Sequence, residues 1–269
     1  MKLKILHYEL TLTSRWILLR NLRTPGREFV WYRNRDQRDR IEGYQNLLNQ
    51  RPELFSNADT LQICTDKSSM LEFERNTQKK IGIVYNNAPY HYILSDLIGG
   101  KKPFAYLRVV PCSTEAGTVM LPRWTDGDGN EFFGVLKIYR HATRSAHLEL
   151  PRGHLEPGLT PAENAVKELG EEFGVCRENI KDLQQIGEAY ADSGLTSGKV
   201  RFFLVDIIGS LPEAALGHEG ILAGKWIPRD EFLGLIRNGT IMDGMTMIAV
   251  LRFLLSQTPA EEAFADHAH

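Results

Sequence analysis

Three glutamates stand close together in the second half of the chain, at Glu168, Glu171 and Glu172. In a helix, residues three and four positions apart lie on the same side, so this spacing brings three carboxylates near one another. Oxygen-only ligands suit a hard divalent cation, Mg²⁺ or Mn²⁺, better than Zn²⁺. A solvated acidic helix face has the same spacing, so spacing alone leaves both interpretations open.

The flanking residues predict a helix from Pro161 to Phe173. Thr160 and Glu163 form a capping box around a proline in the first helical position. Gly174 is typical of the residue that ends a helix, because it tolerates the left-handed conformation. The predicted buried face consists of the apolar residues that recur with helical spacing: Ala162, Ala165, Val166, Leu169 and Phe173.

The stretch from 153 to 175 resembles the Nudix box, G-x5-E-x7-R-E-U-x-E-E-x-G-U, in which U is a bulky aliphatic residue. The positions in register are Gly153, Glu168, Leu169, Glu171, Glu172, Gly174 and Val175. Two positions depart from the pattern: Leu159 stands where the first glutamate belongs, and Lys167 replaces the arginine. In the family these two side chains are mostly structural and tend to interact with each other.

Carried over by position, the resemblance implies that Glu168 and Glu172 are the main metal ligands. Glu171 would be a further ligand or the base, and the carbonyl of Arg152 or Gly153 would complete the shell. The implied cofactor is Mg²⁺, with Mn²⁺ as a possible substitute. Such an ion bridges a pyrophosphate and lowers the pKa of a bound water that attacks phosphorus.

The resemblance covers most of residues 105–255 and is greatest to the ADP-ribose and nucleoside-diphosphate-sugar pyrophosphatases. In that branch an acidic residue on a loop before the last strand often acts as the base, which implies Glu219. Arg140, Arg144 and Arg152 flank the box and are candidates to bind phosphate oxygens. Tyr190 stands near the place where the branch usually has a proline; a tyrosine there is seen in diadenosine polyphosphate hydrolases, where it can stack on a base.

The implied activity is hydrolysis of the pyrophosphate bond in a nucleoside diphosphate that is linked to a second group, X. The expected substrate is ADP-ribose or a nucleoside-diphosphate sugar. Hydrolysis of diadenosine polyphosphates or other nucleotides is one alternative. Decapping of RNA is another. A degenerate Nudix module that binds a nucleotide without cleaving it is a third, motivated by the two departures from the box.

The expected fold class is α+β: a Nudix α/β/α sandwich with a mixed sheet, preceded by a smaller α+β domain. The segment Leu97–Pro103 has the composition of a linker, which predicts domains at 1–102 and 103–269. Strands in runs, with two helices among them, favour this class over a strict β-α repeat. The second helix is predicted to begin at Asp243 as N-cap; its expected buried stripe is Met247, Val250, Leu251 and Leu254.

The first hundred residues match no family pattern and contain no candidate metal cluster. By analogy with related pyrophosphatases, we expect this region to form a homodimer that shapes the substrate site. Several arginines between positions 15 and 40, with Trp31 and Tyr32 among them, motivate nucleic-acid binding as an alternative. Solvated or paired arginines explain the same pattern, so nucleic acid is the less favoured partner.

Composition limits the class of protein. The net charge of −2 and the pI near 6.5 leave no global field that would select a nucleic acid or a membrane. The three cysteines are odd in number and far apart, which argues against a disulfide framework or a zinc site. No signal peptide and no stretch of about 18 apolar residues is visible. We therefore expect a soluble cytoplasmic protein; the resemblance to the Nudix family implies that its partner is a small-molecule nucleotide.

Overall fold

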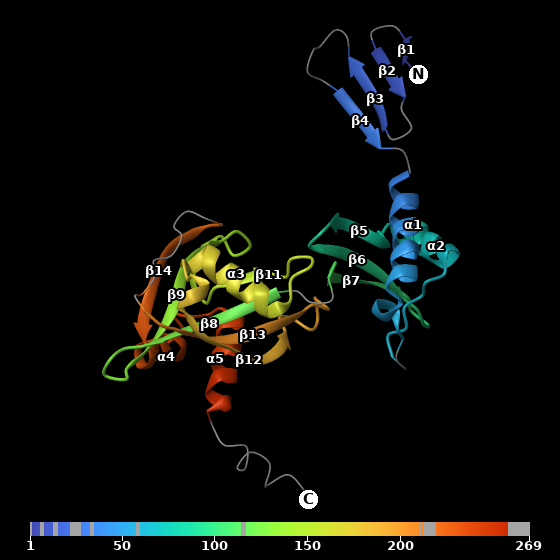
Figure 1. Cartoon of the computed structure of the whole chain (residues 1–269). Coiled ribbons are helices and arrows are strands. Elements are labelled where there is room, and N and C mark those ends of the chain that lie inside the picture. Colours follow the sequence, from blue (N-terminus) through green and yellow to red (C-terminus); the bar gives the residue numbers. More distant parts are fainter. Residues whose placement is uncertain are drawn as a thin grey trace, which may run out of the picture. The chain divides into compact units, whose positions relative to one another are not determined.

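A computed structural model describes most of the chain, and Figure 1 shows its elements. The described residues are 2–5, 8–12, 16–21, 28–32, 35–57, 60–113, 117–209, 211 and 219–257, with the side chains described from residue 37 onward. The chain divides into two compact units. We call Met1–Asn87 with Tyr92–Val109 the N-terminal unit, and Ala88–His91 with Val110–His269 the C-terminal unit.

The N-terminal unit begins with a four-stranded antiparallel sheet in the order β1-β2-β3-β4. Its strands are β1 (Lys2–Ile5), β2 (Tyr8–Leu12), β3 (Trp16–Asn21) and β4 (Glu28–Tyr32). The side chains of most arginines that motivate nucleic-acid binding lie outside the described residues. Two are described: Arg38 is exposed, and Arg40 is buried in an ion pair of 2.6 Å with Glu74.

The remainder of the N-terminal unit combines helices with a three-stranded sheet in the order β5-β6-β7 (Figure 1). These elements are α1 (Arg35–Gln50), η1 (Pro52–Phe55), α2 (Lys67–Thr77), β5 (Gly82–Asn87), β6 (His91–Ile98) and β7 (Phe104–Pro111). Leu97–Pro103 therefore leads from one strand of this sheet to the next. Because β6 and β7 pair in one sheet, this segment is a hairpin connection, and the two units divide between residues 109 and 110.

The C-terminal unit is built on one large mixed sheet in the order β10-β9-β8-β13-β12, with β11 paired to β8 and β14 to β9. Its strands are β8 (Gly117–Thr125), β9 (Glu131–Arg140), β10 (Ser145–Glu149), β11 (Arg152–His154), β12 (Ile180–Tyr190), β13 (Lys199–Ile207) and β14 (Ile221–Pro228). The pair β8–β13 is parallel and the others are antiparallel. The expected mixed sheet is confirmed.

Helices cover both faces of this sheet, which completes the expected α/β/α sandwich (Figure 1). They are α3 (Pro161–Phe173), α4 (Arg229–Arg237) and α5 (Gly244–Ser256), with a short 3-10 turn η2 (Arg177–Asn179). Successive residues of β13 point to opposite faces: Phe202 packs in the cluster of α4 and α5, and Phe203 in the cluster of α3. A strand buried on both faces reads as a nearly continuous apolar run.

Helix α5 has the predicted start but a different buried face. The carboxylate of Asp243 accepts the backbone N–H of Thr246 at 2.9 Å, which confirms the N-cap. Met247 and Leu251, which were predicted to be buried, are 39% and 56% exposed. The buried residues are Thr246, Ala249, Val250 and Phe253. The helix is thus rotated by about one residue from the predicted stripe, with Phe253 packed against the sheet. Among the residues that the structure describes, no helix is both long enough and apolar enough to cross a membrane.

Candidate active site

Helix α3 begins and ends where its local sequence predicts. The Thr160 hydroxyl accepts the backbone N–H of Glu163 at 3.3 Å, and the Glu163 carboxylate accepts the backbone N–H of Thr160 at 2.8 Å. Gly174 takes the left-handed conformation with φ of 67° and closes the last turn. Local hydrogen bonds therefore determine both ends of the helix. The position of the helix in turn determines where its three glutamate side chains point.

The three glutamates have very different surroundings. Glu172 is only 3% exposed, and its Oε2 accepts the backbone N–H of Arg152 at 2.8 Å. Glu168 is half-buried and lies against the backbone of Gly153, where an added Cβ would fall 1.9 Å from its carboxyl carbon. Glu171 is exposed. We call the segment from Arg152 to Thr160, which consists of β11 and the turn after it, the glycine loop. Two of the three carboxylates therefore join α3 to the glycine loop, and only glycine at position 153 leaves room for this approach.

Burial raises the pKa of Glu168 to about 7 and the pKa of Glu172 to about 7. The charges of neighbouring glutamates, including Glu219, add to the rise at both positions. At Glu168 the nearby Lys167 opposes the rise, and at Glu172 the N–H of Arg152 does so. Without a bound cation, the folded protein therefore disfavours the ionised form of both side chains.

These shifts predict that the metal-free protein loses stability as the pH rises. A carboxyl whose pKa is raised on folding from 4.5 to about 7 stabilises the fold fully below 4.5, and that contribution is lost as the pH rises through about 7. We expect the melting temperature in a chelator to be lower at about pH 8 than at about pH 5.5. Scanning fluorimetry measures it, and Glu168→Gln combined with Glu172→Gln should reduce the difference. The same slope in that double variant would contradict the assignment.

The donor chemistry of this site fits a hard divalent cation, although the glutamates do not already form a cage. Glu168 and Glu172 supply carboxylate oxygens beside the loop carbonyls, with Glu219 electrostatically coupled to both. Glu171 instead accepts from the Lys167 ammonium at 2.6 Å. Among the described residues, no group of three or more His, Cys, Asp or Glu side chains lies together as a ready-made metal cluster. The structure thus brings Glu168 and Glu172 to the loop and leaves Glu171 in an ion pair.

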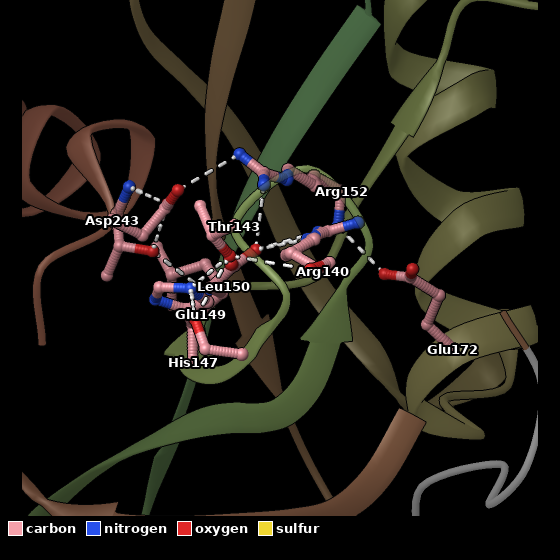
Figure 2. A network of polar contacts seen from close by, with 10 residues as sticks. Arg140, Thr143, His147, Glu149, Leu150, Arg152, Glu172 and Asp243 are labelled. Atoms are coloured by element: carbon pink, nitrogen blue, oxygen red, sulfur yellow. Dashed lines mark hydrogen bonds and ion pairs between the residues drawn. The ribbon is translucent and has the colours of Figure 1, made fainter. Parts of the chain in front are cut away.

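Two arginines are fixed beside the glutamates by one buried carboxylate (Figure 2). Glu149 is 2% exposed and accepts from Arg140 Nη2 at 2.7 Å, while Arg152 Nη2 lies 2.8 Å from the same oxygen. Arg152 Nη1 also contacts Asp243 at 3.2 Å, which ties it to the start of α5. The carboxylates of Glu149 and Asp243 thus hold the two guanidinium groups in place, and both arginines line the same pocket, where their remaining N–H groups can donate to phosphate oxygens.

A pocket of about 460 Å³ in the C-terminal unit brings most of the predicted site residues together. Those that line it are Arg140, Arg152, Gly153, Glu168, Glu171 and Glu219. Glu172 lies behind the loop, bonded to Arg152. The lining does not include Arg144, which is 2.9 Å from the ring of His141, nor Tyr190, whose ring lies 5.8 Å from Lys199 Nζ. Carboxylates for a cation and guanidinium groups for phosphate therefore share one cavity.

Two aromatic residues that the sequence did not suggest also line this pocket. Tyr90 and His154 meet edge to face with ring centroids 5.6 Å apart. Burial of the ring lowers the pKa of His154, and the neighbouring charges of His91, Arg152 and Arg140 lower it further, while Glu219 opposes them. In the sequence, only the position of His154 directly after Gly153 indicates that it could belong to the site. Tyr90 carries no sequence signal, because it lies 27 residues before the first strand of the large sheet.

Comparison with known proteins agrees with this geometry. Residues 117–244 match the family model of the NUDIX domain. This part of the chain is a Nudix domain. A solved structure titled "Crystal structure of ADP compounds hydrolase" is similar at 15% identity with a TM-score of 0.47, and the match covers 65% of this chain and 89% of that chain. The comparison with curated proteins found no match.

Proposed function

We propose that the protein hydrolyses the pyrophosphate bond of a nucleoside diphosphate linked to a second group X, with ADP-ribose or a nucleoside-diphosphate sugar as the substrate. The observation that carries this proposal is the pairing of charges in one pocket. Glu168 and Glu219 line it together with Arg140 and Arg152. A pyrophosphate bound there meets guanidinium groups for its oxygens and carboxylates for the cation that accompanies it.

Glu168 and Glu172 would hold Mg²⁺, or Mn²⁺ in its place, with the carbonyl of Arg152 or Gly153 beside them. When bound, such a cation neutralises phosphate charge and lowers the pKa of a bound water. The chain supplies the rest of the chemistry. Arg140 and Arg152 orient the phosphates, and Glu219 is the candidate base that accepts the proton of the attacking water. Water adds across the P–O–P bridge and leaves two phosphate monoesters.

The nucleoside part of the substrate would occupy the aromatic side of the pocket. Tyr90 is 51% exposed and lines the cavity, whereas Tyr190 does not. An exposed ring provides a stacking surface that any base accepts, at about 1–3 kcal/mol per base. This arrangement supports a nucleotide substrate without selecting one base.

A panel of nucleotides tests the activity. ADP-ribose, two nucleoside-diphosphate sugars, diadenosine tetraphosphate and capped RNA are each incubated with Mg²⁺ or Mn²⁺, and the released phosphate monoesters are quantified. We expect ADP-ribose to give AMP and ribose 5-phosphate. Faster cleavage of the dinucleotide or of the cap would transfer the assignment to those substrates. Calorimetric binding of a nucleotide without any cleavage would identify a binding module instead.

The assembly and the remaining partners are part of the same proposal. We propose a homodimer formed by the N-terminal region, by analogy with related pyrophosphatases, and a cytoplasmic location. Sedimentation of the full chain measures the oligomeric state. A gel shift at low salt measures RNA binding, which should be absent, because phosphate-driven binding would appear there first and would fall steeply with salt.

A further inference from the structure

The two departures from the Nudix box, Leu159 and Lys167, do not face each other as a substitute pair. Lys167 Nζ instead lies 2.6 Å from Glu171 and 3.2 Å from Glu156 Oε1. Glu156 stands three positions before the place where the box has its glutamate. The carboxylate that reaches the basic residue at 167 therefore comes from a different point of the loop.

Glu156 is also held through its backbone. Its N–H donates to the side-chain oxygen of Asn164 at 3.1 Å, and its carbonyl accepts the N–H of Leu159 at 3.2 Å. Asn164 is fully buried and donates to Thr118 on β8 at 3.0 Å. Asn164 and Lys167 are three residues apart and lie on the same side of α3. The loop residue Glu156 is thus attached to α3 at two points, once by its backbone and once by its side chain.

The ion pairs of Lys167 with Glu156 and Glu171 lie at the surface of the protein. Lys167, Glu156 and Glu171 are 34%, 46% and 47% exposed, and exposed ion pairs contribute little to the free energy of folding. The loop that they fasten, however, carries Gly153, whose backbone touches Glu168. An error of about 1 Å in such a contact is enough to lower a rate strongly. The ion pair therefore acts on the geometry of the site more than on the stability of the fold.

We propose that Glu156 and Lys167 are positioning residues that clamp the glycine loop onto α3, in place of the pair that the box pattern puts at positions 159 and 167. The same ammonium orients Glu171 at the rim of the pocket. This inference rests on the proposed function for its kinetic consequence, but the clamp itself exists in the metal-free protein. It explains how the domain tolerates both departures together.

Hydrogen–deuterium exchange of the metal-free protein tests the clamp directly. Glu156→Gln and Lys167→Met should each speed exchange at the loop amides of Glu156 and Leu159 by about threefold, the size expected for an exposed ion pair. The double variant should exchange no faster than Lys167→Met alone, because that variant already removes the bond that Glu156→Gln breaks. Lys167→Arg should leave exchange unchanged, and Lys67→Met, which breaks an exposed pair with Glu42, is the matched control. Unchanged loop exchange in both single variants would overturn the clamp.

Kinetics tests its consequence for the site. We expect Glu156→Gln to lower kcat about tenfold with little change in KM, as for other residues that orient a ligand. Adding Leu159→Glu to that variant returns a carboxylate to the position of the box pattern and should restore kcat and slow exchange. A failure of this rescue together with unchanged exchange would refute the proposal. Inactivity of the wild type on every nucleotide would refute the proposed function alone, since the exchange experiment still decides the clamp.

Discussion

Replacing Glu172 by glutamine is expected to reduce turnover by about 100-fold or more while the fold is retained. Glu172 is buried, and its Oε2 accepts the backbone N–H of Arg152, a bond that the glutamine oxygen can also accept. The variant therefore removes a charge without creating an unpaired N–H. Because burial raises the pKa of Glu172 to about 7, the neutral amide should leave the metal-free protein as stable at about pH 8, or more stable.

Steady-state kinetics with Mg²⁺ and a melting curve in chelator measure the two halves of this prediction. Glu178→Gln is the matched control, because Glu178 is an exposed glutamate in the turn after α3. It should change neither quantity. Turnover of Glu172→Gln near the wild-type level would contradict the assignment of the site. A loss of activity that accompanies a large fall in melting temperature would show that Glu172 serves the fold.

The second large effect is expected for Gly153→Ala. The added methyl group would lie 1.9 Å from the carboxyl carbon of Glu168, a separation that no relaxed structure contains. Either Glu168 must leave the loop or the loop must move away from α3. Both outcomes separate the carboxylate from the loop carbonyls, so we expect at least about a 100-fold loss of kcat/KM, comparable to the loss for a misplaced reacting group.

The control for this substitution is Gly234→Ala in α4. No heavy atom lies within 4 Å of the methyl group that it adds, and alanine favours a helix by about 1 kcal/mol relative to glycine. This variant should keep full activity and a melting temperature at least as high as that of the wild type. The displacement of Glu168 in Gly153→Ala can be seen in a crystal structure of the variant. An active Gly153→Ala enzyme with Glu168 unmoved would show that the close approach is not needed.

Two elements of the C-terminal unit, β12 and α4, carry only weak local sequence signals. Strand β12 (Ile180–Tyr190) contains two register shifts, which break the alternation of apolar and polar residues on which strand prediction depends. Helix α4 (Arg229–Arg237) has only nine residues and no side-chain cap, so neither a long period nor a start signal marks it. The domain boundary was misplaced because Gly99 and Gly100 are typical of a linker and of a hairpin connection alike.

The sequence by itself determined helix α3, its two ends and the spacing of its glutamates. These features depend on hydrogen bonds and side-chain contacts within about four residues, which are local by nature. The order of loop, helix and acidic cluster also sufficed to indicate the Nudix family. The Asp243 cap is likewise local and was predicted from the sequence, whereas the buried face of α5 depends on the sheet and differs from the predicted stripe.

Only the tertiary structure decided what each of these residues does. Burial of Glu172 against the Arg152 backbone and the approach of Glu168 to Gly153 both follow from how the glycine loop lies on α3. The loop is placed by the pairing of β11 with β8 and of β8 with β13, strands far apart in the chain. Such contacts join residues that are far apart in the sequence, so no local pattern predicts them. The three glutamates then differ because a buried carboxylate loses the solvation of its charge, whereas an exposed one keeps it.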